Sequence, residues 1–170
     1  GEQIAILKSA SGQEWKLKNN HIQELNIGGN VILKGDSLQL EISTSQEANQ
    51  QIEGYHILTV PIGGEYHLTL MDGTNVWLNS DSELKFPTRF SENCRELYLK
   101  GEAFFEVVSD SLHPFIVRTG EADIKVTGTA FNVMNYTDEK KLEVALQQGK
   151  IEFKAKESQQ IYLLQPGHVI

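Results

Sequence analysis

The amino-acid sequence predicts an all-β protein, in which many short antiparallel strands form a two-layer sandwich or a twisted, solenoid-like stack with little or no helix. Polar and apolar residues alternate over many short runs, and a period of two places one face of a strand in the core and the other in solvent. Glycines recur between these runs, as expected where short strands turn sharply. The 170-residue length suffices for one core, or for two small subdomains that share a sheet.

The clearest local signal is a β-hairpin. Residues 66–70 and residues 74–78 both alternate between apolar and polar side chains. The dipeptide Asp72-Gly73 lies between them and readily takes the positive φ angles of a tight hairpin turn. We therefore expect two paired strands that turn at this dipeptide.

The same alternation predicts strands elsewhere along the chain. These further strand segments are 38–42, 103–107, 122–126, 131–133 and 150–153.

The segment 137–149 is ambiguous by pattern alone. Thr137 or Asp138 can cap a helix and Gly149 can end it, so that a helix is possible. The apolar residues between 142 and 146 fit helical spacing and strand spacing equally well.

Composition excludes some classes of protein. The formal charge of −8, with no compact basic run, argues against binding to nucleic acid. The longest apolar runs are far shorter than the roughly 18 to 20 residues that a membrane helix needs. A single cysteine, Cys94, forms no intrachain disulfide, so cysteine usage leaves the cellular compartment open.

No motif nominates a catalytic or metal site. The nucleophile elbow Gly-x-Ser-x-Gly is absent, and Cys94 reads as a structural cysteine. The carboxylates are numerous, but no motif singles out a catalytic pair, and we interpret them as a solvated face. The histidines are scattered, without the spacing of metal ligands, at positions His21, His56, His67, His113 and His168. We expect no catalytic residue, no cofactor and no metal, and therefore no enzyme.

Two other features have a functional and a structural interpretation. The segments Gly63-Gly64-Glu65 and Gly128-Thr129 lack the Lys-Ser/Thr ending and the following helix of a phosphate-binding loop, so we expect turns or bulges there. Trp15 and Trp77 are possible platforms for sugar stacking, but we expect Trp77 to be buried in a second packed layer.

From residue 60 onward, the order of turns and aromatic residues is distinctive. The motifs include Val-Pro-Ile-Gly-Gly-Glu-Tyr at 60–66 and Leu-Thr-Leu-Met-Asp-Gly-Thr-Asn-Val-Trp-Leu-Asn at 68–79. Further motifs are Leu-Lys-Phe-Pro at 84–87, Leu-Lys-Gly-Glu-Ala-Phe-Phe-Glu-Val at 99–107, His-Pro-Phe-Ile-Val at 113–117, Val-Thr-Gly-Thr-Ala-Phe-Asn-Val at 126–133 and Leu-Leu-Gln-Pro-Gly at 163–167. In combination they resemble the FecR family over residues 55–170. Nearly all of them join a glycine turn to an alternating strand, so they are mostly determinants of the fold.

The resemblance implies a division at residue 54 and a strand over 142–146 in place of the helix. Residues 1–54 would form an N-terminal juxtamembrane β segment and residues 55–170 a FecR-like β domain, packed as one continuous unit. From the resemblance we expect the membrane helix and the sigma-binding segment of the family upstream, and we expect the family's small C-terminal domain to be absent from residues 1–170.

The function implied is that of the periplasmic region of an anti-sigma factor anchored in the inner membrane. Such a region receives and transmits a signal from a TonB-dependent outer-membrane transporter, through that transporter's signalling domain, and so regulates an extracytoplasmic-function sigma factor. β-Augmentation at an exposed edge strand is a plausible mode of docking. The motifs name no partner-binding residue, and the alternative from the residues themselves is a carbohydrate-binding β module without catalysis.

Overall fold

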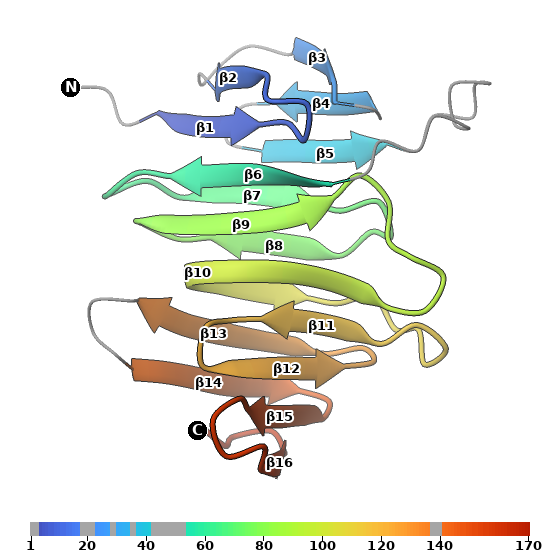
Figure 1. The fold of residues 1–170 in the computed structure, drawn as a ribbon, viewed down its shortest axis with the longest axis vertical. Coiled ribbons are helices and arrows are strands. Elements are labelled where there is room, and N and C mark those ends of the chain that lie inside the picture. The colour runs from blue at the N-terminus through green and yellow to red at the C-terminus, as the bar shows by residue number, and fades with distance from the viewer. Residues whose placement is uncertain (1–3, 18–22, 28–29, 35–36, 42–53, 137–140) are drawn as a thin grey trace.

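The computed structural model describes residues 4–17, 23–27, 30–34, 37–41, 54–136 and 141–170, and its strands stack along one long axis (Figure 1). The predicted all-β class is confirmed, because the described residues form sixteen strands, β1 to β16, and no helix. The described part of the chain contains no helix that is long and apolar enough to cross a membrane.

The strands form two hydrogen-bonded layers, which we call layer A and layer B. Layer A consists, in spatial order, of β2 (Glu14–Leu17), β1 (Ala5–Lys8), β6 (Tyr55–Val60), β9 (Ser82–Pro87), the first half of β10 (Arg95–Glu106), β11 (Phe115–Arg118), β12 (Ala122–Val126), β15 (Ile151–Ala155) and β16 (Ile161–Leu164). Layer B consists of β3 (Gln23–Asn26), β4 (Asn30–Lys34), β5 (Ser37–Glu41), β7 (Tyr66–Thr69), β8 (Asn75–Leu78), the second half of β10, β13 (Ala130–Tyr136) and β14 (Lys141–Gln148). The pairs β10–β11 and β5–β7 are parallel, and every other pair is antiparallel.

Strand β10 joins the two layers. Its first half pairs with β9 and β11 in layer A, and from Gly101 onward it pairs with β8 and β13 in layer B. The crossing point is Gly101, whose φ of +98° lies in the region that favours glycine. A Cβ atom there would lie 2.8 Å from Ser82 Cα, so the backbones of β9 and β10 approach too closely for a side chain. Ser82 Oγ accepts the backbone N–H of Glu102 at 2.8 Å, which holds β10 where it leaves layer A.

The core lies between the two layers and is built from the inward positions of every strand. Along β10 the alternation continues through the crossing, so that Leu97 and Phe105 are both fully buried. Phe105 stacks on Phe131 of layer B, with ring centroids 5.1 Å apart, and meets Phe115 of layer A edge to face at 6.1 Å. Burying such side chains stabilises the fold by about 1.5–3 kcal/mol each.

The predicted strands are confirmed with small shifts of their ends. The segments 103–107, 122–126, 131–133 and 150–153 lie on β10, β12, β13 and β15, and the segment 38–42 lies on β5. The ambiguous region forms strand β14, which confirms the strand over 142–146, while residues 137–140 lie outside the described residues.

The hairpin between β7 and β8 is also confirmed, but its turn is longer than a tight turn at Asp72-Gly73. The N–H of Leu70 bonds to the carbonyl of Thr74, which leaves a three-residue loop, and only Gly73 in it has a positive φ, of +90°. Asp72 instead uses its carboxylate to bond the backbone N–H and the hydroxyl of Thr74. The side chain of Asp72 therefore stabilises a backbone conformation that a dipeptide pattern does not indicate.

The crossing of β10 is tested by placing alanine at three glycines. We expect Gly101→Ala to lower the free energy of unfolding by about 3 kcal/mol, because it adds a steric clash to a strained φ. Gly12 also has a positive φ but has no atom within 4 Å of its Cβ position, so Gly12→Ala should cost about 1 kcal/mol. Gly120→Ala, with open space and no positive φ, should change stability by under about 0.5 kcal/mol. Equal costs for Gly101 and Gly12 in urea denaturation would show that the close approach to Ser82 is unimportant.

Candidate functional site

Cys94 lies half-buried in the turn before β10, without an activating partner among its described contacts. Its Sγ lies 4.0 Å from Glu96 Oε2, to which the thiol can donate. An activated thiolate needs a base or a positive neighbour, whereas a carboxylate is negative. The adjacent Arg95 does not supply the charge, because its side chain points into the core.

The described histidines do not converge on one another. They are His56, buried in β6, His67 on the outward side of β7, His113 before β11 and His168 near the end of the chain. His21 lies outside the described residues. Within the described ranges, no three His, Cys, Asp or Glu residues lie close enough together to hold a metal ion.

His56 is a neutral, fully buried link between three parts of layer A. Its Nδ1 accepts the backbone N–H of Ala10 at 2.9 Å, and its Nε2 bonds to the hydroxyl of Thr88. Since Nδ1 accepts a hydrogen bond, the proton of the neutral ring lies on Nε2. Burial lowers the pKa of His56 to about 4, because the interior disfavours the charged imidazolium.

The tryptophans do not form open platforms for sugars. Trp15 packs against the core. Trp77 faces outward from β8, not into a second packed layer as expected, and it stacks on His67 with centroids 4.8 Å apart and planes 13° from parallel. Phe104 lies on β10, which pairs with β8 on the side away from β7, and its ring centroid is 5.7 Å from that of Trp77. The Trp77 ring is therefore stacked on His67 and also contacts Phe104, and this arrangement gives no support to a carbohydrate-binding module.

The segments Gly63-Gly64 and Gly128-Thr129 lie in the turns between β6 and β7 and between β12 and β13, as predicted. Gly64 N–H bonds to the carbonyl of Pro61 at 3.0 Å, and Gly63 N–H donates to Ser80 Oγ at 2.6 Å. No described helix follows either turn, so neither offers the helix N-terminus that holds a phosphate.

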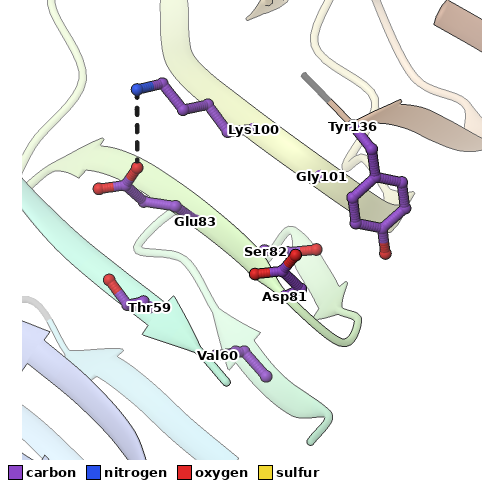
Figure 2. A pocket seen from close by; sticks show the side chains of 8 residues that line it. All are labelled: Thr59, Val60, Asp81, Ser82, Glu83, Lys100, Gly101 and Tyr136. Carbon is purple, nitrogen blue, oxygen red and sulfur yellow. Dashed lines mark ion pairs between the residues drawn. The ribbon is translucent and has the colours of Figure 1, made fainter. Parts of the chain in front are cut away.

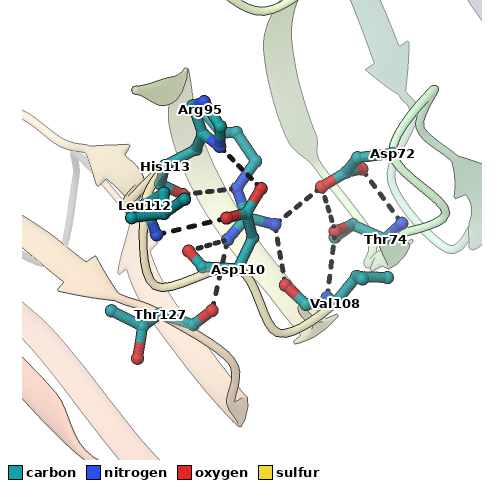
Figure 3. Close-up of polar contacts among 8 residues, drawn as sticks. All are labelled: Asp72, Thr74, Arg95, Val108, Asp110, Leu112, His113 and Thr127. Atoms are coloured by element: carbon teal, nitrogen blue, oxygen red, sulfur yellow. Dashed lines mark hydrogen bonds and ion pairs between the residues drawn. The ribbon is translucent and has the colours of Figure 1, made fainter. Parts of the chain in front are cut away.

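The most concentrated polar cluster surrounds Arg95 at the start of β10, and it is drawn in Figure 3. The guanidinium is almost completely buried and forms an ion pair with Asp72, with Nη1 and Oδ2 2.8 Å apart. The same Nη1 donates to the carbonyl of Val108 at 2.8 Å, and Nε donates to the carbonyl of His113 at 2.8 Å.

Two further bonds complete the cluster. Nη2 of Arg95 donates to the carbonyls of Thr127, at 3.2 Å, and Asp110, at 3.4 Å, and the guanidinium lies 5.4 Å from the ring centroid of Phe115. One side chain thus holds the β7–β8 turn, the β10–β11 loop and the β12–β13 turn together. Removing one partner of a buried ion pair costs about 3–5 kcal/mol, so this cluster is a rigid structural element.

Motif reasoning missed the role of Arg95, although the sequence contains a signal for it. Arg95 is in phase with Leu97 and Leu99, which occupy the buried face of the strand. A charged residue at an inward position predicts a buried partner of opposite charge. Asp72, in the turn of the hairpin predicted over residues 66–78, is a candidate for that partner.

A polar groove of about 410 Å³ lies beside the crossing of β10, and Figure 2 shows the side chains that line it. Lys100 and Glu83 lie across it, with Nζ and Oε2 4.0 Å apart, and the hydroxyl of Tyr136 donates to the carbonyl of Ser80 at 2.7 Å. The lining residues are Thr59, Val60, Asp81, Ser82, Glu83, Lys100, Gly101 and Tyr136. The lining contains neither histidine nor cysteine, so it brings together no pair of nucleophile and imidazole base.

A second polar cluster lies on the outward face of layer A. Arg118 Nε donates to Glu96 Oε1 at 2.7 Å, and Arg118 Nη1 donates to Asp123 Oδ2 at 2.9 Å. The hydrogen bond from Arg118 lowers the pKa of Glu96, and the bond to Glu96 raises the pKa of Tyr98 to about 12. Tyr98 meets Tyr55 edge to face, with centroids 5.3 Å apart. Layer A thus carries an ordered cluster of polar and aromatic side chains on its outward face.

A model of the family described as "FecR protein" matches residues 56–160, which run from β6 to the turn before β16. The chain belongs to the FecR family. The resemblance inferred from the motifs is therefore confirmed. No curated protein matches this FecR chain.

Two crystal structures of a candidate anti-sigma factor from Parabacteroides distasonis ATCC 8503, at 2.50 Å and 1.65 Å resolution, share the fold of this FecR chain. Each is 38% identical, with a TM-score of 0.65 over 67% of this chain. The match covers 53% of the other protein, so the chain spans about half of that protein's length.

The state of His56 makes stability depend on pH. An imidazole with a pKa near 6.5 when unfolded and about 4 when folded binds more protons in the unfolded state. Its stabilisation is complete above pH 6.5 and is lost as the pH falls toward 4, a change of about 3 kcal/mol. His56→Gln can keep both hydrogen bonds but cannot titrate. We therefore expect this variant to lose this part of the decrease in the free energy of unfolding, measured by urea denaturation between pH 6.5 and about pH 4. His168→Gln, at an exposed residue, is the matched control. An unchanged pH dependence in His56→Gln would contradict the assignment.

Proposed function

We propose that this FecR-family chain is the periplasmic region of an anti-sigma factor anchored in the inner membrane, and that it receives and transmits a signal. The observation that carries the proposal is the family match over residues 56–160, together with the shared fold of a candidate anti-sigma factor. The described polar clusters support the same reading, because they order loops and surfaces and assemble no catalytic pair.

The partners follow from the same proposal. The signal comes from the signalling domain of a TonB-dependent outer-membrane transporter, and the output is control of an extracytoplasmic-function sigma factor through a cytoplasmic segment of the same regulator. A membrane helix upstream of the chain connects the two sides.

Within the chain, we infer that residues 1–54 form the juxtamembrane segment and residues 55–170 the receiving domain. The pairings of β1 with β6 and of β5 with β7 support one continuous unit, because hydrogen bonds join the two parts in both layers. A stack joined in this way is suited to transmitting a force or a rotation, since neither layer ends at the division.

The proposal is tested by binding and by transcription. The chain is titrated calorimetrically with the signalling domain of a TonB-dependent transporter from the same organism, and we expect saturable binding with a Kd of about 1 µM for a signalling contact of modest size. In cells, deletion of the full-length gene should make transcription from the sigma-dependent promoter unresponsive to the substrate of the transporter. Absence of binding would refute the receiving role proposed for this chain, and unchanged transcription after the deletion would refute its control of the sigma factor.

A further inference from the structure

The outward face of layer A is unusually rich in basic side chains for an acidic chain. Cross-strand pairing aligns its residues in rows that run across the whole layer. The central row reads Glu14, Lys8, Ile57, Lys85, Tyr98, Arg118, Asp123, Lys154 and Ile161, from β2 to β16.

Counting the charges on this face shows that the positive charge is segregated. Its strands present seven basic side chains, namely Lys8, Lys16, Lys85, Lys100, Arg118, Lys125 and Lys154. They present five acidic side chains, namely Glu14, Glu83, Glu96, Asp123 and Glu152. The difference is +2, whereas the chain as a whole has a charge of −8.

The outward face of layer B has the opposite sign where its side chains are described. Over β7, β8, β10, β13 and β14, the outward positions carry one basic residue, Lys141, against three acidic residues, Glu102, Glu106 and Glu143. The two faces of the sandwich are therefore electrostatically different, and layer A attracts negative charge.

Most of the charges on this face that form no ion pair with a described residue are cations, with Glu14 and Glu152 as the two carboxylates among them. Glu96 and Asp123 are held by Arg118, Lys156 also lies 3.8 Å from Asp123, and Glu83 is near Lys100. The remaining lysines form no ion pair with any described residue, and these are Lys8, Lys16, Lys85, Lys125 and Lys154. Unpaired cations on one face steer an acidic partner toward it and select it by charge.

The same face holds five of the ten large apolar or aromatic side chains that are exposed in the described chain. They are Ile6, Tyr55, Tyr98, Ile161 and Leu163. Near its centre, Tyr98 is 37% exposed and lies directly across from Arg118 on β11. Tyrosine and arginine are the residue types that most often dominate the binding energy of protein interfaces.

We propose that the outward face of layer A is the docking surface for an acidic protein domain, whose carboxylates meet the unpaired lysines and whose apolar centre covers Tyr98. This inference rests on the proposed function, and it identifies the surface at which the signalling domain is received. A protein surface fits this face better than a phosphate-bearing one, because the carboxylates of Glu14 and Glu152 lie among the lysines. A protein can leave gaps opposite those carboxylates, whereas a dense array of phosphates cannot.

The experiment reverses charges on this face and compares them with equal reversals elsewhere. The face variant is Lys85→Glu, Lys125→Glu and Lys154→Glu together. The control variant is Arg89→Glu, Lys141→Glu and Lys150→Glu, three exposed residues in turns or on layer B, with the same change in net charge. Calorimetric titration with the transporter's signalling domain should show at least about tenfold weaker binding for the face variant and a change of under about twofold for the control.

A charge-neutral variant tests the centre of the face. Tyr98→Ala should weaken binding about tenfold. Circular dichroism of all variants checks that they remain folded. Binding of the unaltered chain should also weaken as NaCl rises from about 50 to about 300 mM, because salt screens exposed charges.

Each other outcome contradicts a stated part of the account. If the unaltered chain does not bind the signalling domain, the proposed function fails and this inference fails with it. If the unaltered chain and the face variant bind equally well, the surface is wrong and the proposed function stands. If the unaltered chain binds phosphatidylglycerol vesicles, and the face variant loses this binding while the control variant keeps it, the face is a membrane-contacting surface and the inference is overturned.

Discussion

The structure depends on the passage of one strand, β10, from layer A to layer B. At Gly101 the strand leaves β9 and β11 and joins β8 and β13, and Ser82 occupies the space that a side chain at Gly101 would need. Because the alternation is preserved through the crossing, both halves of β10 direct their apolar residues into the same core. The two layers therefore share a backbone as well as a core, which is the physical basis for treating the stack as one rigid body.

The same strand connects the interior to the surface that we assign to the partner. Arg95 faces inward and holds three turns through its guanidinium, while Glu96 and Tyr98 face outward and order Arg118. A domain that docks on Tyr98 thus contacts a strand whose inner side is fixed by a buried ion pair. Such a contact transmits displacement to neighbouring turns instead of being absorbed by local rearrangement.

Much of the fold follows from local pattern, because a period of two and a turn glycine are properties of adjacent residues. The strands β5, β7, β8, β12, β13 and β15 and the second half of β10 are predictable in this way, as is the hairpin around Gly73. Local pattern could not decide between helix and strand for β14, because short apolar runs fit both. Only the family resemblance decided it. The length of the hairpin loop escaped prediction because Asp72 bonds to Thr74 and Arg95, a partner 23 residues away. The charged face of layer A could not be predicted from local pattern either. Cross-strand register brings together residues that are far apart in the sequence, such as Lys8 and Lys154.

Native-state hydrogen exchange along β10 tests most directly the claim that this strand unites the two layers. The amides of Leu97, in layer A, and Phe105, in layer B, report on the two halves. We expect both to exchange with one free energy, equal to that of global unfolding, because neither layer can open without the other. Two distinct free energies, with either half exchanging well below the global value, would show that the layers open independently and would contradict the account.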